Sequence, residues 1–214
     1  MEKIIFRKVI IALDGILPHK ALTIARKLKG SVWGFKVGDL LYDDSSIISK
    51  LKKFGNVFAD VKLYDIPNTV ANSVKKLAAQ GANIITVHTS GGVEMMRAAK
   101  QNAGKSKIIG VTVLTSQNSK HTKKEVLKLA KTAHSAGLWG IVCSGHELRM
   151  LNKQPGVKKM IKVVPGIRPL SYIKKDDQKR KITPRDAINA GADFLVIGRP
   201  ITGARNPLKA LREL

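Results

Sequence analysis

The chain has 214 residues, of which 43% are hydrophobic and 25% are charged. This length and composition suit one α/β domain with a sizeable core, and they argue against global disorder and against two full domains. Lys and Arg total 39 against 15 Asp and Glu, a formal net charge of +24, which favours anionic partners such as nucleotides or nucleic acid. Because the basic residues are spread along the chain, we interpret most of them as a solvated surface.

The single cysteine, Cys143, excludes an intramolecular disulfide and a cysteine-rich metal site. Near the N-terminus, the apolar run 9–13 is a poor signal peptide and is too short to cross a membrane, and Asp14 follows it at once. We therefore expect a cytoplasmic protein that does not associate with membranes.

Short aliphatic runs alternate along the chain with segments of helical periodicity. The runs cover residues 9–13, 32–37, 57–61, 84–88, 108–114, 140–143, 161–164 and 194–197. In the segments between them, Val70, Val74 and Leu77 share one helical face, and Thr183 before Pro184 is typical of a helix start. Apolar strands separated by helices predict a parallel sheet that is covered by helices.

Eight strand–helix units of about 27 residues each predict a TIM (β/α)8 barrel of the α/β class, formed by residues 1–214 as a single domain. The alternative is a doubly wound open sheet. The first run ends in Leu13-Asp14-Gly15 rather than in a Gly-rich dinucleotide turn, which favours the barrel. In such a barrel the catalytic residues lie at the C-terminal ends of the strands.

Charged residues stand at two of these strand ends. Lys36 interrupts an apolar string, which is costly unless a carboxylate pairs with it. Asp60 and Lys62 flank Val61, and side chains two residues apart on a strand share a face. We predict a cluster of Lys36, Asp60 and Lys62, to which Asp65 could belong, whose members keep one another ionised. A salt-bridge network without chemistry is the alternative, but the position on the catalytic face favours catalysis.

The last two strand ends predict a phosphate site. Gly198 allows a backbone N–H to approach the ligand, and Arg199 supplies a bidentate cation. The long polar segment 168–181 is typical of a lid beside an active site. Among the residues of these strand ends and of this segment, we expect Arg168, Gln178 and Arg199 to contact the phosphate. Most of the lysines should be merely solvated.

Several strings of the sequence resemble the orotidine 5'-phosphate decarboxylase family, in the family's order from about residue 10 to the C-terminus. The segment 60–69, DVKLYDIPNT, resembles the D-x-K-x-x-D-I-x-x-T signature. Further matching elements are Phe35-Lys36-Val37-Gly38, Pro165-Gly166-Ile167-Arg168-Pro169, Asp177-Gln178 and Ile197-Gly198-Arg199-Pro200-Ile201-Thr202. The segment 169–176 departs from the pattern, so the resemblance does not predict how the lid moves.

The resemblance implies a carboxy-lyase that converts orotidine 5'-phosphate to UMP and CO2 in pyrimidine biosynthesis, without a metal or another cofactor. It implies that Lys62 protonates C6 of the pyrimidine beside Asp60, with Lys36 and Asp65 as further catalytic residues. The implied substrate-binding residues are Asp14 and Lys36 for the ribose, Thr115 or Ser116 for the pyrimidine, and Pro165, Arg168, Gln178, Gly198 and Arg199 towards the phosphate. It also implies a homodimer in which Asp65, Ile66 and Thr69 complete the partner's site.

Three other functions compete with this expectation. Sugar-phosphate enzymes of the same superfamily, such as 3-keto-gulonate-6-phosphate decarboxylase or hexulose-phosphate synthase, use Mg2+ and have an acid where this chain has Lys36. A basic RNA-binding protein is disfavoured because the chain has no recognisable RNA module and few aromatic residues, so we expect no specific nucleic acid. A fused UMP synthase is disfavoured because 214 residues leave no room for a phosphoribosyltransferase domain.

Overall fold

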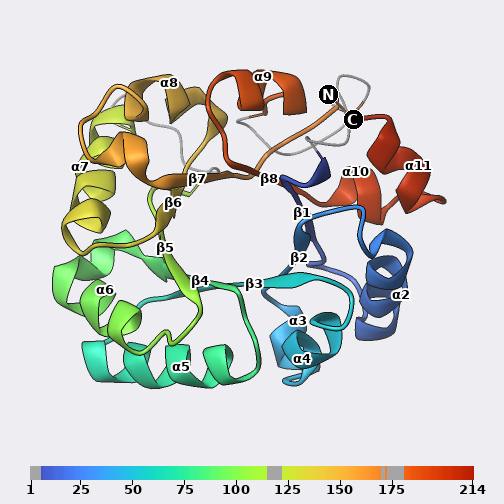
Figure 1. The fold of residues 1–214 in the computed structure, drawn as a ribbon, viewed down its shortest axis with the longest axis horizontal. Coiled ribbons are helices and arrows are strands. Elements are labelled where there is room, and N and C mark those ends of the chain that lie inside the picture. Colours follow the sequence, from blue (N-terminus) through green and yellow to red (C-terminus); the bar gives the residue numbers. More distant parts are fainter. Residues whose placement is uncertain (1–5, 115–121, 170–171, 173–180) are drawn as a thin grey trace.

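A computed structural model describes residues 6–114, 122–169, 172 and 181–214. Eight parallel strands form a closed barrel in sequence order, in which β1 also pairs with β8 (Figure 1). The strands are β1(Val9–Ala12), β2(Gly34–Val37), β3(Asn56–Leu63), β4(Ile84–His88), β5(Lys107–Val111), β6(Gly140–Val142), β7(Ile161–Val164) and β8(Phe194–Ile197). The prediction of a TIM (β/α)8 barrel is confirmed.

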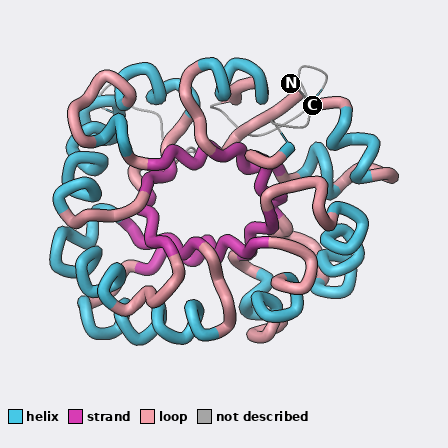
Figure 2. Tube along the Cα trace, viewed as in Figure 1, coloured by secondary structure: helices cyan, strands magenta, loops and turns pink. Residues whose placement is uncertain are grey.

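Helices surround the barrel on its outer side (Figure 2). They are α2(Pro18–Leu28), α3(Leu40–Asp43), α4(Ile47–Leu51), α5(Pro67–Ala79), α6(Gly92–Gln101), α7(Thr122–Ser135), α8(Leu148–Leu151), α9(Pro184–Asn189), α10(Arg199–Thr202) and α11(Pro207–Arg212), with short 3-10 turns η1(Thr89–Gly91), η2(Gly145–Glu147) and η3(Val157–Lys159). As predicted, Thr183 caps α9: its side chain accepts a hydrogen bond from the backbone N–H of Asp186, and Pro184 opens the first turn. No helix in the described ranges is long and apolar enough to cross a bilayer.

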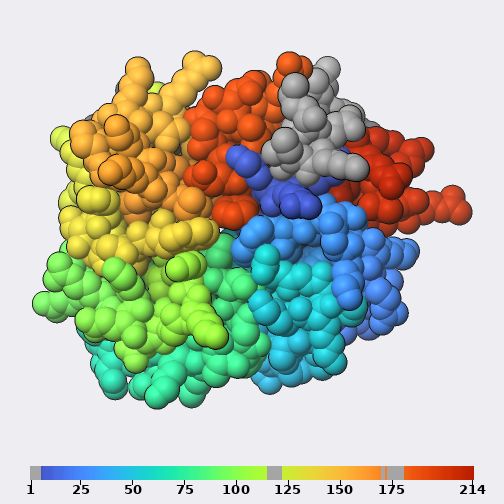
Figure 3. Space-filling model, viewed as in Figure 1, coloured from blue at the N-terminus to red at the C-terminus, as the bar shows by residue number. Residues whose placement is uncertain are grey.

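The core has two layers because successive side chains of a strand point to opposite faces. Inside the barrel, one buried cluster contains Ile10, Phe58, Ile84, Ile109, Val163 and Val196. A larger cluster of aliphatic side chains fills the space between the barrel and its helices. The tube drawing leaves the centre of the ring open, whereas atoms cover that centre in the space-filling view of the same orientation (Figure 3). The side chains of the inner buried cluster therefore fill the interior of the barrel, as in other small barrels.

Some predicted strand bounds differ from the structure. The runs 84–88, 161–164 and 194–197 match their strands, but 108–114 overshoots β5, which ends at Val111. The run 32–37 starts too early, because β2 begins at Gly34 and the ring of Trp33 instead packs against Phe194, with ring centroids 5.1 Å apart. Conversely, β3 outlasts the predicted 57–61, because Leu63 still pairs with Val87 of β4.

Candidate active site

A cavity of about 450 Å³ opens at the C-terminal ends of the strands. This is the end of a TIM barrel at which catalytic residues are found. Of the side chains and glycines that the sequence analysis selected, those that line the cavity are Asp14, Lys36, Asp60, Lys62, Pro165, Arg168, Gly198 and Arg199. The structure thus brings together residues from β1, β2, β3, β7 and β8 or from the loops that follow them.

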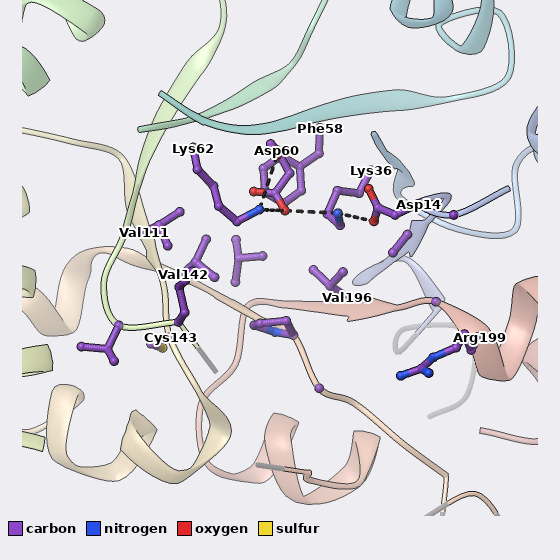
Figure 4. A pocket seen from close by; sticks show the side chains of 18 of the residues that line it. Asp14, Lys36, Phe58, Asp60, Lys62, Val111, Val142, Cys143, Val196 and Arg199 are labelled. Carbon is purple, nitrogen blue, oxygen red and sulfur yellow. Dashed lines mark hydrogen bonds and ion pairs between the residues drawn. The ribbon is translucent and has the colours of Figure 1, made fainter. Parts of the chain in front are cut away.

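Two lysines and two aspartates form a continuous row along one wall of this cavity (Figure 4). The ammonium group of Lys36 donates a hydrogen bond to Asp14 and lies 3.1 Å from Oδ2 of Asp60. The ammonium group of Lys62 lies 2.9 Å from the same Oδ2 atom. The predicted contact of Lys36, Asp60 and Lys62 is therefore present, and Asp14 extends it.

Burial and charge act against each other on the two inner members of the row. Burial alone would lower the pKa of Lys36, but the carboxylates of Asp60 and Asp14 outweigh it and raise this pKa above its ordinary 10.5. Burial alone would raise the pKa of Asp60, but Lys36 and Lys62 hold this pKa below its ordinary 3.8. Both groups therefore stay charged at neutral pH and face each other as fixed charges.

The backbone that carries Lys62 is unusual. Lys62 has a φ of +48°, and no other non-glycine residue in the described segments has a positive φ. A left-handed conformation costs a residue with a side chain about 1–2 kcal/mol. Such strain persists only where surrounding contacts hold it, and here it lies at the lysine that the sequence analysis selected for chemistry.

Gly38, directly after β2, leaves room for the aspartate at the outer end of the row. A Cβ atom at this position would lie 2.9 Å from Oδ1 of Asp14, too close for an unshifted carboxylate. The glycine in the predicted string Phe35-Lys36-Val37-Gly38 therefore has a local packing reason.

The rest of the cavity wall near the row is apolar. Phe58, Val111, Val142, Val163 and Val196 line it, and the thiol-bearing Cys143 lies beside them, 1% exposed. An apolar wall lowers the local dielectric, so the charges of the row act more strongly on a bound molecule than they would in water. A flat, uncharged ring could lie against these side chains while the row faces its edge.

The arginine end of the cavity is built by the loops after β7 and β8. Gly198 precedes α10, and the exposed Arg199 lies apart from the lysine–aspartate row (Figure 4). Arg168 is only 5% exposed, and its Nη1 donates a hydrogen bond to the carbonyl of Ile167 at 2.9 Å. Both arginines reach the cavity, although their contact with a phosphate stays a prediction.

Other selected residues lie elsewhere. Asp65, Ile66 and Thr69 are exposed at the start of α5 and do not line the cavity, and Oδ1 of Asp65 accepts a hydrogen bond from the N–H of Ile66 at 2.7 Å. Within one chain, Asp65 therefore does not join the row of Lys36, Asp60 and Lys62. The predicted contacts of Thr115, Ser116 and Gln178, and most of the predicted lid 168–181, lie outside the described residues.

The sequence analysis gave no role to two residues of β4 near Lys62. Thr86 is fully buried and hydrogen-bonds to both Asp60 and Lys62. His88 stands at the strand end, where burial and the charge of Lys62 lower its pKa. Both fall on the inward face of β4, two and four residues after Ile84, so the alternation of the strand could have placed them there.

The described residues offer no group of three or more His, Cys, Asp or Glu side chains arranged to hold a metal ion. The carboxylates of Asp14 and Asp60 both face the cavity, but the ammonium group of Lys36 contacts both of them. A cation between these carboxylates would have to displace that ammonium group.

The barrel and the row of charges define an enzyme of the TIM-barrel class, and comparison with known proteins assigns the family. A model of the "Orotidine 5'-phosphate decarboxylase / HUMPS family" matches residues 7–214. The chain is 41% identical to an orotidine 5'-phosphate decarboxylase from Idiomarina loihiensis, over 97% of this chain and 96% of that protein. It is 40% identical to one from Dichelobacter nodosus, over 96% of each chain.

Solved structures give the same result. The crystal structure of orotidine 5'-phosphate decarboxylase from Lactobacillus acidophilus is 36% identical, with a TM-score of 0.81 over 96% of each chain. That of orotidine 5'-monophosphate decarboxylase from Methanocaldococcus jannaschii, complexed with the inhibitor BMP, is 25% identical, with a TM-score of 0.79 over 97% of this chain and 96% of that chain. The chain belongs to the orotidine 5'-phosphate decarboxylase / HUMPS family, which confirms the resemblance seen in its sequence.

Proposed function

We propose that this enzyme decarboxylates orotidine 5'-phosphate to UMP and CO2 in pyrimidine biosynthesis, with residues 1–214 acting as one cytoplasmic catalytic domain. The observation that carries the proposal is the ammonium group of Lys62, which faces the cavity 2.9 Å from the carboxylate of Asp60. The names of the relatives at 40–41% identity support the same substrate.

The substrate would lie across the cavity with its charged end at the arginines. The phosphate would bind Arg199 and the N–H groups beside Gly198, with Arg168 and Gln178. The ribose hydroxyls would contact Asp14 and Lys36. The pyrimidine would lie against the apolar wall, and Thr115 or Ser116 would read its polar edge. This orientation puts C6 of the ring towards the lysine–aspartate row.

Decarboxylation breaks the bond between C6 and the carboxylate carbon. The electron pair stays on C6 in the plane of the ring, where the π system cannot absorb it, and CO2 leaves as a neutral molecule. The ammonium group of Lys62 stabilises this developing negative charge and then transfers one proton to C6, which gives UMP. The neutral amine regains its proton from solvent. A fixed charge aimed at transition-state charge is usually the largest catalytic contribution.

Asp60 would act in two ways. It holds Lys62 in place, since Oδ2 of Asp60 accepts a hydrogen bond from the lysine. It would also face the substrate carboxylate, and the repulsion between the two negative groups is relieved when neutral CO2 leaves. Because Lys36 and Lys62 lower the pKa of Asp60, its carboxylate is charged when the substrate arrives.

The proposed reaction needs neither a metal nor an organic cofactor, because Lys62 supplies both the positive charge and the proton. The alternative within the superfamily is an Mg2+-dependent sugar-phosphate enzyme, which has an acid at the position of Lys36. In this chain, the ammonium group of Lys36 contacts Asp14 and Asp60, and its charge would repel a divalent cation at that point.

We further propose a homodimer in which Asp65, Ile66 and Thr69 serve the site of the partner chain. These residues follow β3 directly and are exposed, as is Tyr64 beside them. Ile66 is 67% exposed and Tyr64 65% exposed, so two large apolar side chains would be covered by such an interface.

The test is turnover of orotidine 5'-phosphate, followed by ultraviolet absorbance in the presence of EDTA. We expect full activity in the chelator. Loss of activity that Mg2+ restores would favour the sugar-phosphate alternative. An absence of turnover, combined with RNA binding that falls steeply with salt, would favour a nucleic-acid-binding protein.

A further inference from the structure

The pairing of β3 with β4 is interrupted at the candidate active site. The register pairs Ala59 with Ile85 and next pairs Leu63 with Val87. Four residue steps along β3 therefore correspond to two along β4, and the segment from Asp60 to Lys62 faces Thr86. This irregularity is where Lys62 adopts its φ of +48°.

The Thr86 side chain compensates for the interrupted pairing. The backbone N–H of Lys62 donates a hydrogen bond to Oγ1 of Thr86 at 2.8 Å. That N–H is thus satisfied by a side chain instead of a strand carbonyl, and the left-handed conformation is stabilised where a regular strand would not adopt it.

The same hydroxyl also contacts the aspartate. A hydroxyl has one proton to donate, and Oγ1 of Thr86 lies 3.1 Å from Oδ1 of Asp60 but 3.5 Å from the carbonyl of Ala59, so the carboxylate is the better acceptor. The other oxygen of Asp60, Oδ2, faces the ammonium groups of Lys36 and Lys62. Both carboxylate oxygens are therefore held, which fixes the plane of the group.

We propose that Thr86 is a positioning residue for the reaction, because its one hydroxyl sets both the backbone of Lys62 and the carboxylate plane of Asp60. Thr86 does not line the cavity and is 0% exposed, so it acts through these two residues and not on the substrate. The inference rests on the proposed function, in which Lys62 and Asp60 act at C6. A displacement of Lys62 by a fraction of an ångström would weaken its interaction with the developing carbanion more than it weakens binding of phosphate and ribose.

Thr86→Val tests this inference, because valine keeps the shape of threonine and removes the hydroxyl. We expect kcat to fall by about tenfold to a hundredfold while KM changes by less than about threefold. Binding of UMP should stay native, whereas a UMP analogue with an anionic oxygen at C6 should bind at least about tenfold more weakly, because its charge needs Lys62 in place. Thr86→Ser keeps the hydroxyl and should restore kcat to within about threefold of wild type.

Thr89→Val is the matched control. Thr89 is also buried, at 1% exposed, but its hydroxyl donates to the carbonyl of Val111 at 2.7 Å rather than to Lys62 or Asp60. This variant loses a buried hydroxyl and a hydrogen bond, so its melting temperature should fall about as far as that of Thr86→Val while its kcat stays native. If Thr86→Val does not fold, Thr86→Ala takes its place in the same measurements, with the same expected results.

Three results would overturn the inference: a native kcat in folded Thr86→Val, equal losses of affinity for UMP and for the anionic analogue, or a kcat in Thr86→Ser as low as in Thr86→Val. Lys62→Ala separates this inference from the proposed function. Native turnover in Lys62→Ala would remove the proposed function itself. An inactive Lys62→Ala beside a native Thr86→Val would remove only the role of Thr86.

Discussion

Lys36 and Asp60 come from adjacent strands, and the ammonium nitrogen of Lys36 lies 3.1 Å from Oδ2 of Asp60. Only 11% of the Lys36 side chain and 12% of the Asp60 side chain are exposed, so each charge depends on the other. A buried charge that loses its partner keeps its desolvation cost without the compensating attraction. The pair therefore contributes both to the stability of the fold and to the site, because the two residues that would contact the substrate also stabilise each other's charge.

Lys36→Met is expected to lower the free energy of unfolding by about 3 kcal/mol, the low end for breaking a buried ion pair, because the methionine keeps the length of the side chain and Asp60 retains Lys62 as an ion-pair partner. Urea unfolding at neutral pH measures this loss. Lys50→Met is the control at the surface. Lys50 lies 2.7 Å from Asp44, but 48% of its side chain is exposed, so the same substitution should cost less than about 1 kcal/mol. Equal losses in the two variants would contradict a special role of burial at Lys36.

The contribution of this pair to stability should be constant across the neutral pH range. The pKa of Asp60 lies below its ordinary 3.8 in the folded state, so its stabilisation is fully present above pH 3.8 and is lost as the pH falls through the folded pKa. The pKa of Lys36 lies above its ordinary 10.5, so its stabilisation is fully present below pH 10.5 and is lost as the pH rises through the folded pKa.

The measurement is the difference in unfolding free energy between wild type and Lys36→Met from about pH 6 to about pH 9, a range that both native pKa values leave unaffected. We expect the same difference at each pH. A difference that shrinks by half within this range would mean that one of the two groups titrates there, contrary to the shifts described.

Lys62→Ala should lower kcat by more than about a thousandfold, because it removes both the positive charge and the proton at C6. UMP and its 6-substituted analogues without a negative charge at C6 should still bind, since the phosphate and ribose contacts remain. Steady-state kinetics and calorimetric titration give the two quantities. Lys75→Ala, on the exposed face of α5, is the control for loss of a lysine and should behave as wild type. Turnover near the native rate in Lys62→Ala would refute the assignment.

The barrel and the row of charges were predictable from the sequence because both depend on local periodicity. Asp60 and Lys62 stand two residues apart in an apolar strand, and Lys36 interrupts another apolar string, so each departure from the pattern was visible without the structure. The contact between Lys36 and Asp60 was predictable because neighbouring parallel strands of a barrel end at the same face.

The interruption of β3 was not predictable in the same way. The sequence analysis treated residues 57–61 as a regular strand, whereas the register shifts after Ala59 and Lys62 has a positive φ. At the shift, the backbone N–H of Lys62 donates a hydrogen bond to Thr86, which lies 24 residues further along the chain. Thr86 is a polar residue in an apolar run, and the run alone shows neither which strand it faces nor which atoms it contacts.

Arg199→Ala is expected to raise KM by about tenfold to a hundredfold, because a hydrogen bond to a charged group contributes about 1.5–3 kcal/mol. A smaller fall in kcat should accompany it if binding of the phosphate helps to exclude water. Arg205→Ala is the control, since Arg205 is exposed nearby but does not line the cavity. Unchanged kinetics in Arg199→Ala would remove this arginine from the phosphate site.

Asp65 offers a test of the proposed dimer that depends on mixing two inactive variants. If Asp65 serves the partner's site, a mixed dimer of Lys62→Ala and Asp65→Asn chains contains one intact site, built on the Asp65→Asn chain and completed by the native Asp65 of the other. The second site of that dimer lacks both residues. Random reassociation makes half of the dimers mixed, so about one quarter of the native specific activity should return. The control mixture combines Lys62→Ala chains with Asp60→Asn chains. Each substitution removes a residue from the row of its own chain, so no dimer contains an intact site and the mixture should stay inactive. If the first mixture also stays inactive while native mass spectrometry shows mixed dimers, Asp65 does not act across the interface.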